Sequence, residues 1–385
     1  MKIENINQFL DEIKKLESKN GNSLFYRGHS DKTYDLEPSI YRKDKKTNKL
    51  LYIENEDKIY RETIAKVPYD FNGKNTIESL VLMQHYGVPT RILDLTTNPL
   101  VALYFACVGN ENEDGEVIVF DIPEESICYF DSDRVTILAN LAKCKNSFYY
   151  YKDDVYCRCK SYLGELEKKF PYISYSIDSK EYRKLKNYVT QKIDSYIKED
   201  KLFFLLPTKT IVNKFTNEKH TFLKDEEDKS FLLFIQELKR KVKSVLWKKR
   251  LSINKDFFGE LLHFIKEDRS YFQNIIDPDD IGSVFAIKPK LNNPRIVRQH
   301  GAFLIFGIKE SPPFFGKRTE FTKEMVKIPS QWIERGDSSE NSIIIEKSNK
   351  DSILKELEKL GINKSTLFPE IDKVADYIKE KYIQK

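Results

Sequence analysis

An arginine stands at the end of a short aromatic run near the start of the chain. The segment Phe25-Tyr26-Arg27-Gly28-His29-Ser30 has the composition of a buried strand that ends at a glycine. A guanidinium in such a place is costly unless it pairs with a carboxylate or holds an anionic ligand. Gly28 lets the backbone turn or approach a ligand closely. Arg27 is therefore either half of a structural ion pair or a ligand-binding residue.

A second set of polar side chains lies within residues 84–100, where a predicted helix ends, a short strand runs and another helix begins. Packing does not require these side chains, and junctions of this kind aim binding groups from a rigid scaffold. Alternatively, Arg91 and Asp94 form a structural pair, and Thr96 or Thr97 caps the following helix. The candidate binding residues of this stretch are His85, Arg91, Asp94, Thr96 and Thr97.

The third set lies directly before a predicted buried strand, in the segment Arg295-Ile296-Val297-Arg298-Gln299-His300-Gly301-Ala302-Phe303. This segment contains two arginines, a glutamine and a histidine. The side chain of Gln299 can both donate to and accept from a ligand hydroxyl or amide. The alternative is that Gln299 satisfies only a neighbouring backbone group. Arg298 and Gln299 are the candidate site residues of this segment.

The three segments together resemble the FRG domain family, which is named for an aromatic-Arg-Gly triplet, here Tyr26-Arg27-Gly28. The middle segment, Gln-His-Tyr-Gly-Val-Pro-Thr-Arg-Ile-Leu-Asp, continues through Asn98-Pro99 to Ala106 and is too long for a chance match. Residues 367–371, Leu-Phe-Pro-Glu-Ile, also resemble the usual ending of the family. Residues 123–280 have no counterpart in this resemblance.

The three-part layout of the family resembles, more distantly, the ADP-ribosyltransferase fold, in which a split sheet holds NAD as a substrate. This resemblance implies that Arg27 binds a phosphate or ribose of NAD. It also implies that Thr96 or Thr97 belongs to the middle element and that Gln299 takes the catalytic position. The residues implied for NAD binding are Tyr26, Arg27, Gly28, His85, Arg91, Thr96, Thr97 and Arg298.

Cleavage of the bond between nicotinamide and ribose passes through an oxocarbenium-like state, which negative charge and hydrogen bonds to the 2-hydroxyl stabilise. Gln299 can hold the hydroxyl but brings no charge and cannot deprotonate an acceptor. Asp94 would supply the carboxylate, so Arg27, Asp94 and Gln299 form the predicted catalytic set. The implied function is an NAD-dependent ADP-ribosyltransferase-like enzyme, a bacterial toxin or antiphage effector that modifies nucleic acid or protein. The alternative is a non-enzymatic sensor of a nucleotide or nucleic acid.

Hydrophobic periodicity and turn signals predict helices, short strands and a large helical insertion. The resemblance implies an α+β, ADP-ribosyltransferase-like fold, in which helices pack on a split mixed or antiparallel sheet. Residues 1–122 and 281–385 form the two parts of the predicted FRG domain, and residues 123–280 form the insertion. We expect helices near residues 6–16, 55–66, 76–86, 100–108, 231–247, 349–360 and 371–382. We expect strands near residues 23–27, 90–94, 115–121, 284–287, 302–306 and 321–328.

Composition and charge disfavour several other classes. The net charge of +5, from 65 basic and 60 acidic residues, does not by itself indicate nucleic acid. No apolar stretch approaches the ~18 residues that span a bilayer, and the first residues lack a signal-peptide pattern, so we expect a cytoplasmic protein without membrane contact. Five irregularly spaced cysteines predict neither a disulfide framework nor a zinc site. The chain lacks a Rossmann glycine turn and a phosphate loop.

One basic run stands out within the predicted helix at residues 231–247 and just beyond it. Seven basic residues and no acidic residue lie between Leu238 and Arg250, with Trp247 among them. The run is either a phosphate-contacting surface for RNA or another partner, or a solvated helix face. The residues that would make this contact are Lys239, Arg240, Lys241 and Lys243.

Overall fold

The computed structural model describes residues 2–19, 21–169, 224–311, 323–336 and 342–383. The chain forms two compact units, of which one comprises Met1–Tyr149 with Gly259–Lys385 and the other comprises Tyr150–Phe258. Residues 123–149 and 259–280, which we expected in the insertion, therefore pack within the first unit.

A mixed sheet of nine strands organises the described part of the first unit, in the order β1-β9-β4-β2-β3-β7-β6-β5, with β8 paired to β4. Most neighbours are antiparallel, whereas β1 with β9 and β5 with β6 are parallel. The α+β class with a mixed sheet is thus confirmed. The strands are β1 (Lys2–Ile3), β2 (Asn22–His29), β3 (Ile92–Thr96), β4 (Gly115–Pro123), β5 (Ile127–Tyr129), β6 (Val284–Lys288), β7 (Gly301–Phe306), β8 (Ile333–Arg335) and β9 (Ile343–Ile345).

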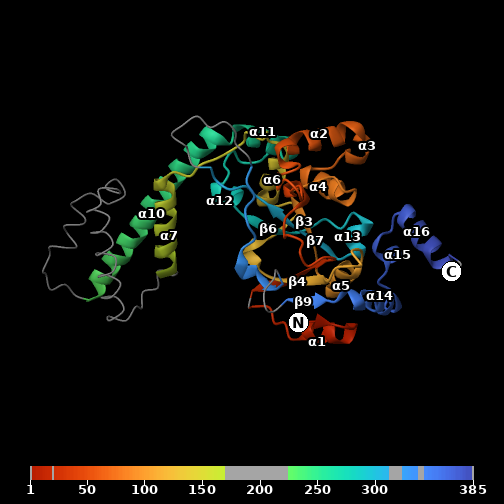
Figure 1. The fold of residues 1–385 in the computed structure, drawn as a ribbon. Coiled ribbons are helices and arrows are strands. Elements are labelled where there is room, and N and C mark those ends of the chain that lie inside the picture. The colour runs from red at the N-terminus through yellow and green to blue at the C-terminus, as the bar shows by residue number, and fades with distance from the viewer. Residues whose placement is uncertain (1, 20, 170–223, 312–322, 337–341, 384–385) are drawn as a thin grey trace. The chain divides into compact units, whose positions relative to one another are not determined.

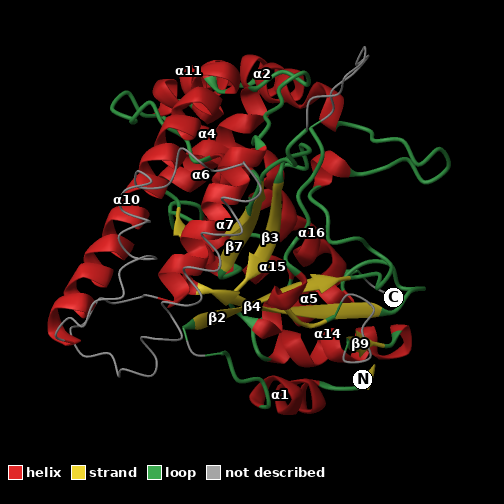
Figure 2. Ribbon diagram, turned by 90° about the vertical axis from the view of Figure 1, so that its left-hand side faces the viewer, coloured by secondary structure: helices red, strands yellow, loops and turns green. Residues whose placement is uncertain are grey.

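The sheet nearly divides between β2 and β3. Strand β2 pairs with β4 over its whole length, from Asn22 opposite Pro123 to His29 opposite Glu116. In contrast, β2 meets β3 at a single register pair, Tyr26 opposite Thr96. Figure 2 shows that β3 and β7 run steeply across the direction of β2 and β4. The two halves of the sheet diverge from this pair, which opens a space between them.

Helices of the first unit cover both halves of the sheet (Figure 1). Helices α1, α5 and α14 lie beside β4 and β9, and α2, α4 and α6 lie toward the end of β3 and β7. The helices are α1 (Ile6–Lys14), α2 (Glu56–Lys66), α3 (Pro68–Phe71), α4 (Thr76–His85), α5 (Pro99–Cys107), α6 (Asp133–Asn140), α11 (Gly259–Asp268), α12 (Pro278–Ile281), α13 (Pro294–Arg298), α14 (Lys350–Lys359), α15 (Lys364–Leu367) and α16 (Ile371–Tyr382). Short 3-10 turns are η1 (Ser39–Tyr41), η2 (Ile53–Asn55), η3 (Glu124–Ser126), η4 (Leu141–Lys143), η5 (Ser330–Trp332) and η6 (Lys347–Asn349).

Alternate residues of β2 and β4 face two different hydrophobic cores. Tyr26, Val117 and Val119 pack with α5 on one face of the sheet. Phe25 and Ile118 pack on the other face with side chains from β3, β6 and β7. Because both faces are covered, β4 reads as an almost continuous apolar segment rather than as an alternating one.

Two glycines allow α5 to lie directly on the sheet. A Cβ atom at Gly28 would stand 1.9 Å from the backbone oxygen of Ala102, and one at Gly115 would stand 2.1 Å from that of Ala106. Neither contact is possible, so only glycine fits at these positions. The glycine of the aromatic-Arg-Gly triplet is therefore required for helix packing.

Two predicted strands differ from those observed. Strand β3 runs from Ile92 to Thr96 instead of over residues 90–94, which places Thr96 at the end of a paired strand. Residues 323–328 form no strand beyond an isolated bridge between Ile308 and Met325, and residues 321–322 lie outside the described chain. The side chain of Lys323, at the start of the described part of this segment, is buried in the first unit. Residues 127–129, expected to be helical, instead form β5 beside β6.

In the second unit, α7 (Asp154–Lys169) and α10 (Lys224–Phe257) pack against each other. The predicted basic run lies on α10, where Lys243 pairs with Glu167 at 3.2 Å and Lys249 pairs with Asp153 at 2.6 Å. The side chain of Lys241 lies outside the described residues. A nucleic-acid contact through this run stays a prediction. Within the described residues, no helix has the length and apolar character needed to span a membrane.

Candidate functional site

A cavity of about 230 Å³ opens where the two halves of the sheet diverge. Residues from β2, β3, α4, α5 and α13 converge on it, together with the turn after α13 and the segment after α15. The cavity therefore joins all three sequence segments that carry candidate site residues. It is lined by Tyr26, Arg27, Gly28, Gln84, His85, Asp94, Leu95, Thr96, Val101, Phe105, Arg295, Gln299 and Phe368.

Thr96 ties the three segments together. Its backbone stands opposite Tyr26 in the sheet, and its hydroxyl Oγ1 donates to the carbonyl oxygen of Gln299 at 2.7 Å. Oγ1 of Thr96 also accepts from the backbone N–H of Asn98 at 3.0 Å, just before the start of α5. The backbone of His300 adopts a left-handed conformation, with φ of +48°, which histidine tolerates better than most residues. The turn before β7 is thereby fixed against the end of β3.

Arg27 is half-buried and faces the cavity. Its Nε donates to Nε2 of His29 at 2.9 Å, and its Nη1 donates to the backbone oxygen of Asp94 at 2.6 Å. Within the described part of the chain, no carboxylate oxygen lies within 4 Å of its guanidinium. Burial lowers the pKa of Arg27, with Asp94 opposing this shift, but an arginine stays charged. The structural ion pair is absent here, so Arg27 keeps N–H groups for an anion.

His29 supports Arg27 as a neutral acceptor. The imidazole is buried, and its Nδ1 has no hydrogen-bond partner in the described residues. Burial first, and then the nearby Arg27 cation, lower the pKa of His29 to about 3. A neutral ring with the proton on Nδ1 leaves Nε2 free to accept from Arg27. The hydrogen bond to His29 thus orients the guanidinium of Arg27 and leaves its positive charge without compensation.

Asp94 is an exposed carboxylate on the central residue of β3. Its Oδ2 accepts from Nε2 of Gln84 at 2.9 Å. The orientation of that amide is set by Thr90, whose hydroxyl donates to Oε1 of Gln84 at 2.7 Å. Asp94 therefore has a defined position at the cavity while it remains accessible to a ligand.

Gln299 and the segment after α15 close another side of the cavity. Nε2 of Gln299 donates to the backbone oxygen of Leu367 at 3.1 Å. The neighbouring Phe368 ring meets Phe105 edge to face, with centroids 6.0 Å apart. Both aromatic rings line the cavity. Within residues 367–371, which resemble the family ending, Phe368 thus lines the cavity and Leu367 holds Gln299.

His85 and Arg295 form a fixed corner of the cavity. Nη1 of Arg295 donates to the backbone oxygen of His85 at 2.8 Å, and its Nε lies 3.0 Å from a carboxylate oxygen of Glu370. The guanidinium also stacks on the ring of Phe368, 4.9 Å from the centroid. Burial, followed by the charge of Arg295, lowers the pKa of His85. The imidazole is therefore neutral near pH 7.

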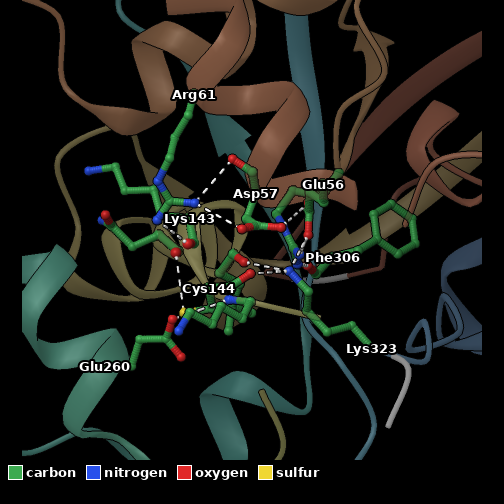
Figure 3. Close-up of polar contacts among 12 residues, drawn as sticks. Glu56, Asp57, Arg61, Lys143, Cys144, Glu260, Phe306 and Lys323 are labelled. Carbon is green, nitrogen blue, oxygen red and sulfur yellow. Dashed lines mark hydrogen bonds and ion pairs between the residues drawn. The ribbon is translucent and has the colours of Figure 1, made fainter. Parts of the chain in front are cut away.

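Arg91 does not line the cavity, which corrects the prediction that it binds a ligand. It is fully buried, and its guanidinium forms a two-pronged ion pair with Glu56, with Nε donating to Oε1 at 2.8 Å. Its Nη1 donates to the backbone oxygen of Phe306 at 2.9 Å. The buried ammonium of Lys323 binds the same carboxylate of Glu56 at 2.7 Å (Figure 3). The alternative pairing of Arg91 with Asp94 is also wrong, because Glu56 takes that place.

Two further candidates lie beside the cavity without lining it. Thr97 is exposed, and its Oγ1 donates to the backbone oxygen of His300 at 3.4 Å. Arg298 is exposed, and its Nη1 donates to the backbone oxygen of Thr366 at 3.3 Å. Both side chains are held at the surface by backbone oxygens. Tyr26, Arg27, Gly28, His85, Asp94, Thr96 and Gln299 are the predicted site residues that the structure brings together.

The sequence prediction missed four polar or aromatic lining residues: Gln84, Phe105, Arg295 and Phe368. Each lies within a segment that carried the family resemblance or in its closing residues. Their chemistry was not distinctive, because a glutamine in a helix or a phenylalanine in an apolar run is ordinarily structural. Only the position of each residue within these segments could have identified it.

The cavity fits part of a nucleotide better than a whole dinucleotide. Its volume lies just below the roughly 300–1,000 Å³ of ordinary ligand pockets. The lining combines a cation at Arg27, a carboxylate at Asp94 and aromatic rings at Phe105 and Phe368. This set can hold an anionic group, a positively charged centre and a planar ring at the same time. Among the residues described, no group of three or more His, Cys, Asp or Glu side chains could hold a metal ion.

Residues 22–115 match the family model of the FRG domain. The matched region contains β2, β3 and α5, and with them Arg27, His85 and Asp94. No curated protein and no solved structure was found to match the chain. The match covers the two earlier segments of the cavity and supports the resemblance to the FRG family.

Proposed function

We propose that this protein binds NAD with its nicotinamide ribose in the cavity and transfers the ADP-ribose group of NAD to a nucleic acid or protein acceptor. In this reaction the bond between nicotinamide and ribose breaks, and nicotinamide leaves with the bonding electron pair. A bond forms between the ribose carbon and the acceptor, which gives up a proton. The observation that carries the proposal is the convergence of Arg27, Asp94 and Gln299 where the sheet divides.

Each of the three residues has a chemical part in this proposal. Arg27 offers an unpaired cation to the pyrophosphate, because charged hydrogen bonds to phosphate oxygens are strong. Asp94 stabilises the positive charge that develops on the ribose in the transition state. Gln299, held by Leu367, binds a ribose hydroxyl through its remaining amide groups.

A non-enzymatic nucleotide sensor is the second candidate, and Gln299 is the observation that favours it. The side chain is neutral and already donates to Leu367, so it cannot act as the base for an acceptor. Asp94 is exposed, where water weakens its electrostatic effect. Under this alternative the same cavity binds the ligand and leaves it intact.

The test is NAD binding by calorimetry together with nicotinamide release by the purified full chain. Arg27→Ala and Asp94→Asn are the test variants, and Arg298→Ala is the matched control, since this arginine is exposed outside the cavity lining. We expect Arg27→Ala to weaken binding at least tenfold, Asp94→Asn to abolish release with binding retained, and Arg298→Ala to change neither.

The outcomes separate the two candidates. Release that depends on Asp94 supports the transferase. Binding that depends on Arg27 without any release supports the sensor and overturns the transferase. Folded protein that does not bind NAD, or that releases nicotinamide equally well in every variant, overturns both assignments to this cavity.

A further inference from the structure

The hydrogen bonds around Asn293 fix the direction of its side-chain amide. Asn293 caps the short helix α13, and its Oδ1 accepts from the backbone N–H of Arg295 at 2.8 Å. The oxygen must face the helix for this bond to form, because the amide nitrogen can only donate. Nδ2 consequently faces away from the helix, toward His85, where it lies 3.1 Å from Nδ1 of the ring.

This arrangement determines which nitrogen of His85 carries the proton. Nδ2 of Asn293 donates, so Nδ1 of His85 has to accept. A neutral imidazole then bears its proton on Nε2. Burial and the charge of Arg295 keep the ring neutral, consistent with the lowered pKa of His85. Nε2 has no partner within the described chain, and His85 lines the cavity.

We propose that Asn293 is a positioning residue that holds His85 as a neutral Nε2–H donor, so that the cavity selects a ligand with an acceptor oxygen at this place. A carbonyl or hydroxyl oxygen of the ligand can accept this hydrogen bond. The ligand part of this inference rests on the proposed NAD site. The helix cap fixes the direction of the Asn293 amide, and the amide fixes the proton position on the His85 ring.

The substitution Asn293→Asp isolates this effect. Aspartate caps a helix as well as asparagine does, so α13 is kept. It presents a carboxylate oxygen to Nδ1 of His85 in place of an N–H group, and the ring must then carry a proton on Nδ1. Asn5→Asp is the matched control, because Asn5 also caps a helix through Oδ1 and hydrogen-bonds to no histidine of the described chain.

Long-range ¹⁵N–¹H NMR of the histidine rings reads the protonation state directly. The chain has five histidines, so the signals of His85 can be assigned by their loss in His85→Gln. We expect the Nε2–H form in the wild-type chain and in Asn5→Asp. We expect a proton on Nδ1 in Asn293→Asp, either alone or in a doubly protonated ring. An Nδ1–H form in the wild type, or an unchanged ring in Asn293→Asp, overturns the positioning role.

NAD titration tests the ligand part. Asn293→Asp should bind NAD about tenfold more weakly, with unchanged affinity in Asn5→Asp. In a His85→Gln background, the amide of glutamine supplies a donor that does not depend on residue 293. Asn293→Asp should therefore have little further effect there.

Two outcomes overturn the donor role. One is a tenfold loss of NAD affinity from Asn293→Asp in the His85→Gln background, and the other is unchanged NAD affinity of Asn293→Asp in the wild-type background. A wild-type chain that does not bind NAD overturns the proposed function, and the NMR result still decides the role of Asn293.

Discussion

Arg27 and Arg91 both lie in the region that matches the FRG family model, yet the structure uses them in opposite ways. Arg91 is fully buried, with both prongs of its guanidinium on Glu56 and its remaining N–H direction on a backbone oxygen. Arg27 is half-buried, and it bonds only to a neutral histidine and a backbone oxygen within the described chain. The first guanidinium is saturated, whereas the second keeps both its charge and free N–H groups.

Arg91 and Arg27 differ in the groups that compensate their charge. In the interior, the carboxylate of Glu56 is shared by Arg91 and Lys323, and backbone oxygens of Leu141 and Cys144 take the remaining ammonium protons. Such a cluster is costly to break because removal of one member leaves another buried and unpaired. At the cavity, no carboxylate of the described chain pairs with Arg27, and its charge stays available to the ligand that we propose.

The largest expected effect comes from breaking the interior cluster of Glu56, Arg91 and Lys323. Arg91→Ala should lower the free energy of unfolding by about 3–5 kcal/mol, because it leaves Glu56 with only part of its compensation in the interior. Chemical denaturation followed by circular dichroism measures this loss. Arg27→Ala is the matched control and should cost about 1 kcal/mol, the value of ordinary hydrogen bonds. Equal costs for the two variants would show that the distinction between the two arginines is false.

The next effect concerns the glycine beside Arg27. Gly28→Ala should destabilise the first unit by about 1–3 kcal/mol, since the added carbon meets backbone atoms of α5 that cannot move aside. Gly259→Ala is the control, because no atom lies within 4 Å of its added carbon. Denaturant midpoints of the two variants give the comparison. A stable Gly28→Ala chain that loses NAD binding would mean that this glycine serves the ligand and not the helix.

The pH dependence of the unfolding free energy distinguishes the cavity from the interior cluster. Because the pKa of His29 is lowered to about 3 in the folded chain, His29 takes up a proton on unfolding at any pH between about 6.5 and 3. The stability that neutral His29 contributes is fully present above pH 6.5 and is lost as the pH falls toward 3. The loss amounts to about 2 kcal/mol by pH 5. His85 shifts in the same direction. The variant His29→Gln, which keeps an acceptor for Arg27, should flatten this part of the stability curve.

The interior cluster responds at lower pH. Burial alone would raise the pKa of Glu56, but Arg91 and Lys323 outweigh burial and hold it below its ordinary value of 4.5. The stability that this carboxylate contributes is present above pH 4.5 and is lost as the pH falls through the lowered pKa. Unfolding free energies measured from pH 7 to 3 should therefore fall in two stages. A single stage below pH 4.5 that His29→Gln leaves unchanged would contradict the assignment to His29.

The smallest effect is expected at Thr97, which lies beside the cavity without lining it. Thr97→Ala should change the free energy of unfolding by less than about 0.5 kcal/mol, because the side chain is exposed and its hydrogen bond is long. NAD affinity should also remain within about twofold. Thr96→Ala is its contrast, since that hydroxyl bonds to both Gln299 and Asn98. Calorimetry on both variants would show whether the site includes Thr97, which a loss of affinity comparable to that of Thr96→Ala would require.

The local structure and the types of side chain at the site follow from the sequence. The helices expected near residues 76–86 and 100–108 are α4 and α5, which begin at the side-chain caps of Asn75 and Asn98. These features depend on hydrogen bonds within one helical turn. The segments that hold Arg27, Asp94 and Gln299 were identified in the same way, from residue types and spacing.

The packing of distant segments sets which arginine has a carboxylate partner, why Gly28 is a glycine and where the sheet divides. Glu56 lies 35 residues from Arg91 and 267 from Lys323. The helix that Gly28 accommodates begins at Pro99, far along the chain. Sequence patterns report the preferences of a residue and its near neighbours, whereas the partner of a buried charge is set by which distant segments pack together. For this reason Arg27 and Arg91 look alike in the sequence and differ in the fold.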